Sequence, residues 1–204
     1  MDILSELNPA QREAVISIQG PVLALAGPGS GKTRALTHRI AYLVRECDIP
    51  PWNIVAVTFT NKAAREMRSR LETLLTPNQV NALSVGTFHA LCARWLRQDI
   101  DALGHYDRNY VIYDTSDQQS VVKRAVRDLS LDEKAWKPRP IHFAISKAKN
   151  EMIGPDRFQT RTYQEEIIQR VYARYQEILI ANNALDFDDL LLVTFQLFNR
   201  NDIV

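Results

Sequence analysis

Short apolar runs and stretches with helical periodicity alternate through the first hundred residues. Three runs are predicted to be strands, at residues 21–26 (PVLALA), 54–59 (IVAVTF) and 82–85 (ALSV). After each run, apolar residues recur at spacings of three and four, which predicts a helix. Alternation of this kind is typical of a parallel sheet, and we expect the sheet to be buried on both faces.

Helical periodicity continues through the second half of the chain without further strand-like runs. Ser116 followed by Gln119 predicts a capped helix start, and Pro140 suits the first turn of another helix. A longer helix is predicted over residues 163–180, and Asp186 is predicted to cap a last one. The fold class is therefore α/β, with an incomplete parallel sheet and an all-helical inserted subdomain.

Composition narrows the choice of partners and compartment. The 204 residues are 46% hydrophobic, and 25 Lys and Arg oppose 24 Asp and Glu, so any site for a polyanion must be local. The chain lacks an apolar stretch of about 18–20 residues and a signal-like start, and Cys47 and Cys92 fit no zinc spacing. We expect a cytoplasmic protein with reduced thiols.

A segment with the sequence AGPGSGKT lies between the first predicted strand and its helix. In this context glycines let the backbone approach a phosphate, Lys32 reaches the β- and γ-phosphates, and the Thr33 hydroxyl is a ligand for Mg²⁺. The strict pattern begins with Gly, where this chain has Ala26. The predicted nucleotide-binding residues of the loop are Ala26, Gly27, Pro28, Gly29, Ser30, Gly31, Lys32 and Thr33.

Polar and aromatic residues also follow the second and third predicted strands. TFTNKAAREMR begins at Thr58 and GTFH begins at Gly86. The carboxyl ends of parallel strands share one edge, where such donors can meet phosphates and Phe rings can meet bases. Taken alone, each segment is better explained as a helix cap beside a core Phe.

The motifs occur in the order LNPAQREAV, AGPGSGKTR, AVTFTNKAAREM, VGTFH and LDFDDLL. This order resembles superfamily 1 DNA helicases of the UvrD/PcrA/Rep type over essentially the whole chain. The resemblance implies a RecA-like P-loop NTPase fold, ATP and Mg²⁺ as cofactors, and 3′→5′ movement on single-stranded DNA. It also implies single-stranded DNA and single-strand/duplex junctions as partners.

Site residues follow from the resemblance position by position. Gln11 matches the glutamine that reads adenine, and Arg34 matches a residue that packs against the base. Lys32 and Thr33 match the catalytic lysine and threonine of the loop. The matched DNA-binding positions are Thr58, Phe59, Asn61, Lys62, Thr87, Phe88 and His89.

Residues 106–184 are similar to subdomain 1B of these helicases, which sits over the DNA, and residues 1–105 and 185–204 to subdomain 1A. Within 1B, WKPRPIHFAISKAKNE interleaves basic and aromatic residues. Lys147 and Lys149 are predicted to contact DNA, because such a stretch suits a nucleic-acid backbone. A solvated helix face explains the same charges.

The family's apolar strand ending in Asp-Glu has no match in the sequence. Asp186, Asp188 and Asp189 begin a predicted helix, where capping explains them better than a metal site does. We therefore expect an N-terminal fragment that binds nucleotide weakly and does not turn it over. The alternatives are part of a helicase-nuclease, a P-loop kinase or nucleotide sensor without a DNA role, and a non-catalytic DNA-binding module.

Overall fold

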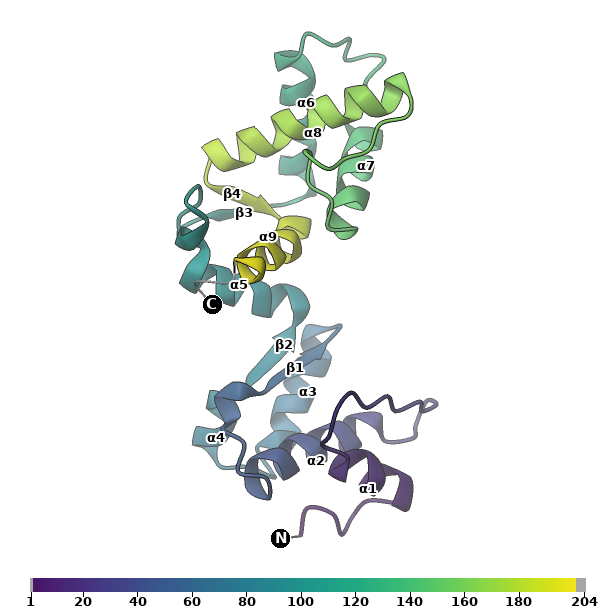
Figure 1. Cartoon of the computed structure of the whole chain (residues 1–204), viewed down its shortest axis with the longest axis vertical. Helices are drawn as coiled ribbons and strands as arrows, with labels where there is room; N and C mark the ends of the chain where they lie inside the picture. Colours follow the sequence, from purple (N-terminus) through teal and green to yellow (C-terminus); the bar gives the residue numbers. More distant parts are fainter. Residues whose placement is uncertain (1, 201–204) are drawn as a thin grey trace. The chain divides into compact units, whose positions relative to one another are not determined.

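The computed structural model describes residues 2–200 and has mixed α/β secondary structure (Figure 1). The chain divides into two compact units, Met1–Leu91 and Cys92–Val204, each considered by itself below. The first unit contains α1 (Pro9–Ile16), α2 (Lys32–Arg45), the 3₁₀ turn η1 (Pro51–Asn53), β1 (Val55–Thr58), α3 (Asn61–Leu71), α4 (Pro77–Ala82) and β2 (Ser84–Thr87). Helix α5 (Phe88–Asp99) begins in this unit and ends in the next.

The first unit is built on a parallel pair of strands. β1 and β2 pair in register from Val55 opposite Ser84 to Thr58 opposite Thr87, so both strands end at one edge. α3 packs on the strands and α2 packs on α3. These contacts confirm the predicted strand at residues 54–59, and they place the third predicted strand two residues later than expected. The core consists of Ile3, Ile40, Ala41, Val44, Ile54, Ala56, Met67, Leu71, Leu75, Val80 and Leu83.

The predicted strand at residues 21–26 is absent from the structure. The segment is irregular and exposed, with Leu23 at 84% and Leu25 at 87% of full exposure. A strand forms only when a neighbour takes up its hydrogen bonds, and within residues 2–200 no strand pairs with this segment. The expected burial of both sheet faces is wrong for the same reason, since Val55 of β1 remains 49% exposed.

The second unit is mainly helical. Its elements after α5 are η2 (Ile100–Leu103), β3 (Val111–Tyr113), α6 (Thr115–Asp128), α7 (Pro138–Asn150), α8 (Tyr163–Ala181), β4 (Ala184–Asp186) and α9 (Phe187–Asn199). α8 lies across α6 and α7 (Figure 1), and the three helices enclose a core around Val122, Val171 and Tyr172. No helix within residues 2–200 is long and apolar enough to cross a membrane.

The prediction of an all-helical segment over residues 106–184 is wrong, because the segment contains a strand. β3 and β4 form a short parallel pair in which Tyr113 lies opposite Asp186. Three residues per strand are too few for periodicity to reveal, so the pairing escapes a reading of the sequence alone. The strands bracket α6, α7 and α8, and they bring the two ends of this helical segment together.

Helix starts in this unit follow their capping chemistry. α6 begins with Asp114 rather than the predicted Ser116, because the Asp114 carboxylate accepts from the backbone N–H groups of Ser116 and Asp117 at 2.7 and 2.9 Å. Asp186 caps α9 as predicted, accepting from Asp189 N at 2.7 Å. Both helices therefore begin with a reciprocal capping box.

Candidate nucleotide and nucleic-acid sites

The glycine-rich loop leads directly into α2. Gly29 and Gly31 have φ angles of 74° and 83°, in the left-handed region that a side chain disfavours. Gly31 is the N-cap of α2 and supplies no side-chain acceptor, so capping leaves the N–H groups of the first turn available to an anion. Thr33 lies in this first turn, directly after Lys32.

Lys32 lies back across its own loop. Its Nζ donates to the carbonyl oxygens of Ala26 at 2.9 Å and Gly27 at 2.8 Å, and Ser30 Oγ donates to Gly27 O at 2.7 Å. The ammonium group is therefore held against the loop by oxygen acceptors. Phosphate oxygens are stronger acceptors of the same kind, so this donor set fits a nucleotide phosphate.

Gln11 is brought to the loop from α1. Its Nε2 donates to Ser30 O at 2.9 Å, while its Oε1 accepts from Asn8 N at 3.2 Å. A Cβ on Gly31 would lie 2.6 Å from Gln11 Nε2, which is closer than real Cβ contacts come. The φ angle therefore favours glycine at position 31, and a side chain there would also make the Gln11 amide move.

Arg34 forms an ion pair that the sequence did not predict. Its Nη2 lies 2.6 Å from Glu6 Oε2, and both side chains are about half exposed. His38, one turn further along α2, contacts Ile3 O at 2.7 Å through Nδ1. These contacts attach the N-terminal segment to α2, and no sequence motif marks Glu6 as a partner.

The two strand-end segments lie side by side, because Thr58 and Thr87 are opposite each other in the β1–β2 register. Capping accounts for two hydroxyls: Thr60 Oγ1 accepts from Ala63 N at 3.1 Å, and Thr87 Oγ1 accepts from Ala90 N at 3.3 Å.

Core packing does not account for the two aromatic rings. Phe59 is 93% exposed and Phe88 51% exposed, so their faces are open to a ligand. Asn61 and Lys62 are exposed in the first turn of α3, and His89 is half-buried near the start of α5.

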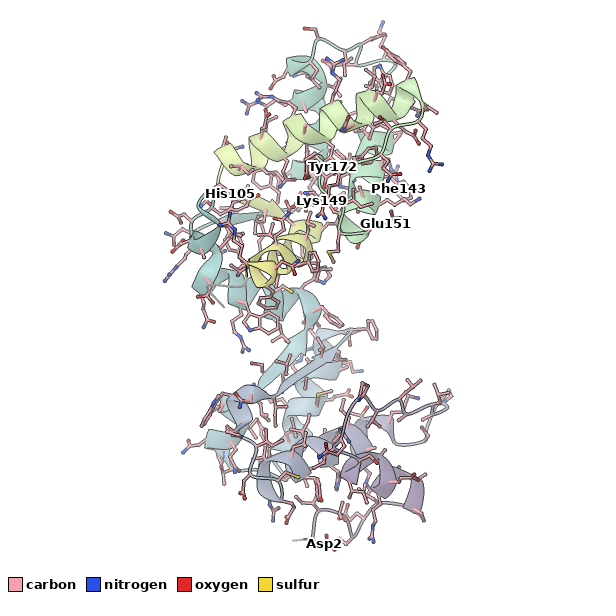
Figure 2. All side chains as sticks on the ribbon, in the orientation of Figure 1. Asp2, His105, Phe143, Lys149, Glu151 and Tyr172 are labelled. Carbon is pink, nitrogen blue, oxygen red and sulfur yellow. The ribbon has the colours of Figure 1, made fainter. Side chains whose placement is uncertain are left out.

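The predicted DNA contacts in the second unit separate into two different environments. Lys147 is exposed on α7, but Lys149 is fully buried. Lys149 Nζ lies 2.7 Å from both Asp186 Oδ2 and Asp189 Oδ1 (Figure 2 shows the side chain inside the unit near Tyr172). The prediction for Lys149 is therefore wrong, because a sealed and paired ammonium group cannot reach a phosphate.

The buried cluster has unusual electrostatics. Burial raises the pKa of Asp189 to about 6. Burial also disfavours the charged form of Asp186, but the Lys149 charge and the hydrogen bond from Tyr175 Oη, 2.7 Å away, keep that pKa below its ordinary value. The two carboxylates outweigh burial at Lys149 and hold its pKa high. The cluster ties α7 to β4 and α9, which is a structural role.

The sequence of the chain matches a known protein family. The UvrD/REP helicase N-terminal domain family matches residues 7–204. The chain belongs to this family. Membership implies the P-loop NTPase fold, which agrees with the loop leading into α2 and with the parallel strands.

Several relatives in this family are ATP-dependent DNA helicases named PcrA. Identity is 50% over 200 residues with the protein of Bacillus subtilis, and 46% and 45% with those of Staphylococcus aureus and Staphylococcus epidermidis. These alignments cover 97% of this chain but 27% of each relative. The chain therefore spans about a quarter of the length of these curated relatives.

Proposed function

We propose that this chain is the ATP-binding N-terminal part of a DNA helicase that couples ATP hydrolysis to 3′→5′ movement on single-stranded DNA and to duplex unwinding. The main support for DNA binding is the register of β1 and β2, which aligns Thr58 with Thr87 beside two exposed Phe rings. The main support for ATP binding is the start of α2 after the glycine loop, where no side chain caps the helix. The direction of movement rests on family resemblance.

For the nucleotide, the loop residues 26–31 and the first turn of α2 would surround the phosphates. Lys32 would exchange the carbonyls of Ala26 and Gly27 for phosphate oxygens, and Thr33 would offer its hydroxyl to Mg²⁺. Gln11 and Arg34 would meet the base. Bound Mg²⁺ neutralises phosphate charge in this chemistry, and the chain's own residues bind and orient the nucleotide.

For DNA, exposed Phe59 and Phe88 supply faces for unpaired bases, and the first turns of α3 and α5 supply donors for the backbone. Lys62 adds a cation, and Asn61, Thr58, Thr87 and His89 add polar groups. Single-strand/duplex junctions are proposed as the natural substrate. In the proposed domain organisation, residues 1–105 and 185–204 belong to the motor subdomain and residues 106–184 to the insertion.

The test of the DNA half is the affinity of the chain for fluorescent oligo-dT. Phe59→Ala should weaken binding about 5- to 100-fold, because one base stack contributes about 1–3 kcal/mol. Trp52→Ala is the matched control, since Trp52 is an exposed aromatic residue (70%) of the same unit outside both motifs. Equal effects of the two substitutions would show that the strand-end segments are ordinary turns.

The test of the ATP half compares the chain with its Lys32→Ala variant under Mg²⁺ and oligo-dT. We expect the original chain to bind nucleotide more tightly than the variant, with no steady-state turnover above it. DNA-stimulated turnover that Lys32→Ala abolishes would show that residues 1–204 already hold a complete hydrolytic site. Equal nucleotide affinity of the chain and the Lys32→Ala variant would contradict the proposal that the glycine loop binds ATP.

A further inference from the structure

The outer face of α7 combines two cations with an exposed aromatic ring. Arg139, Phe143 and Lys147 are spaced by four residues and therefore share one face of the helix. The opposite face, with Ile141 and Ile145, is buried in the core. Phe143 is 72% exposed, and Figure 2 shows it on the outer side of α7, away from Lys149 and Tyr172.

A hollow of about 570 Å³ adjoins this ring. It is lined by Thr115, Gln119, Arg139, Pro140, His142 and Phe143. These residues offer neutral hydrogen-bonding groups, one cation and an aromatic face, and none of them is acidic. The His142 imidazole is held by a hydrogen bond between its Nε2 and Gln118 Oε1, which fixes the ring beside Phe143.

The basic face has a defined extent. Arg139 and Lys147 lie about 12 Å apart along the helix axis, at about 1.5 Å per residue. Beyond Lys147 the charge changes sign: Asn150 Nδ2 donates to Asp188 Oδ1 at 3.1 Å, and Glu151 follows α7 (Figure 2). A polyanion would therefore follow the N-terminal three turns of α7 rather than its end.

We propose that this face of α7 binds single-stranded nucleic acid by stacking an unpaired base on Phe143, with backbone phosphates beside Arg139 and Lys147. The inference rests on the proposed function in that single-stranded DNA is the ligand, and it adds a base-stacking contact separate from Phe59 and Phe88. An aromatic ring between two cations suits a base with phosphates on either side, whereas an acidic protein surface would use the cations alone.

Exposure by itself does not produce such a site, as a second aromatic residue shows. Tyr163 is 71% exposed in the same unit, but it begins α8 next to the acidic residues Glu165 and Glu166. A phosphate backbone would be repelled there. Tyr163→Ala is therefore a matched control for Phe143→Ala, since both remove an exposed ring from a helix of the same unit.

The experiment measures fluorescence anisotropy of the whole chain with labelled oligo-dT and with an abasic oligonucleotide of the same length. Phe143→Ala should weaken oligo-dT binding about 5-fold or more and leave abasic binding within 2-fold, because only the first ligand has bases to stack. Tyr163→Ala should change neither. Circular dichroism would confirm that both variants keep the original fold, as expected for exposed side chains.

The salt dependence of DNA affinity tests the phosphate contacts separately. The double variant Arg139→Gln and Lys147→Gln should lower the slope of log affinity against log salt by about 1.4, since each phosphate contact on a single strand contributes about 0.7. The double variant Lys123→Gln and Lys134→Gln, which removes two exposed lysines of the same unit elsewhere, should leave the slope unchanged.

The outcomes separate this inference from the proposed function. If Phe59→Ala weakens oligo-dT binding and Phe143→Ala does not, the α7 site is overturned while the proposed function stands. Equal losses of oligo-dT and abasic binding with Phe143→Ala would exclude base stacking. Equally strong binding of poly-glutamate, lost with the same substitutions, would identify the face as a site for acidic polypeptide and overturn the inference.

Discussion

The ammonium nitrogen of Lys149 lies 2.7 Å from Oδ1 of Asp189, at a place where neither side chain meets solvent. Asp186 accepts from the same ammonium group at 2.7 Å, and Tyr175 Oη donates to that carboxylate. Three formal charges thus occupy the interior where α7, β4 and α9 meet. Breaking such a cluster costs more than its net stabilisation, because the groups that remain are charged and unpaired.

Lys149→Met should destabilise the chain by about 3–5 kcal/mol in urea denaturation, since it leaves two buried carboxylates without their cation. Lys147→Met is the control, because this side chain is exposed on the same helix and should change the free energy of unfolding by less than about 0.5 kcal/mol. A loss below about 1 kcal/mol for Lys149→Met would mean that the cluster does not hold α7 in place.

The free energy of unfolding should depend on pH because of the raised pKa of Asp189. Its pKa is about 6 in the fold against an ordinary 3.8, so the folded state binds the extra proton more tightly than the unfolded state. The contribution of Asp189 to the free energy of unfolding is therefore fully present below about pH 4. It is lost as the pH rises through about 6, by up to about 3 kcal/mol in total. Asp189→Asn should flatten urea-derived stability between pH 4.5 and 6.5.

The hydrogen-bond donors around Asp189 oppose the effect of burial on its pKa, since Lys149 Nζ, Gln176 Nε2 and the backbone N–H of Asp186 all donate to its carboxylate. Asp189 faces Lys149 from α7, Asp186 from β4, and Tyr175 and Gln176 from α8, with Tyr106 and Tyr172 also close. Gln176 Oε1 is buried and has no hydrogen-bond partner among the described residues. Stability that rises steadily from pH 4.5 to 6.5 in the original chain would contradict this account.

Gly31→Ala should destabilise the glycine loop more than Gly29→Ala does. Both positions have positive φ angles, which cost an alanine about 1–2 kcal/mol, but the new Cβ contacts Gln11 Nε2 at position 31 and has nothing within 4 Å at position 29. Thermal denaturation and nucleotide affinity both measure the difference. In a Gln11→Ala background the two substitutions should become equivalent, and a persistent difference would exclude the side-chain contact as its cause.

Glu6→Gln should leave stability within about 0.5 kcal/mol, because its ion pair with Arg34 is half exposed. If Arg34 meets the base as proposed, the substitution should also tighten nucleotide binding by a few-fold, because the guanidinium no longer has to leave a carboxylate. Isothermal titration with an ATP analogue measures the change, with Arg34→Gln as the partner variant. Unchanged affinity in Glu6→Gln together with weaker affinity in Arg34→Gln would show that Glu6 does not compete for Arg34.

Features set by local chemistry were predictable from the sequence. The glycine loop, the helix that follows it, the strand over residues 54–59 and the Asp186 cap each depend on a few adjacent residues. The family also followed from the order of the motifs, and the comparison confirms it. Local rules failed at Asp114, because Asp117 at the third helical position completes a capping box in place of the usual Glu or Gln.

Features set by distant partners were not predictable in the same way. Residues 21–26 have the composition of a strand, but strand formation depends on a neighbour that composition does not reveal. One feature of the sequence could have predicted the burial of Lys149. It lies four residues after Ile145 and therefore shares the buried face of α7, whereas Lys147 lies on the exposed face. A lysine in that position requires an internal anion, and Asp186 and Asp189 were the available acids.

The Lys149 cluster also has a consequence for the alignment of α7 against α9, because its ion pairs form only in the observed alignment. Apolar side chains accept many neighbours, so a helix shifted by one turn could still bury Ile141 and Ile145. The same shift would separate Lys149 from both aspartates and leave three buried charges unpaired, which raises the energy of every misaligned packing. We therefore expect the cluster to contribute little net stabilisation and to act mainly by disfavouring alignments that separate Lys149 from the two aspartates.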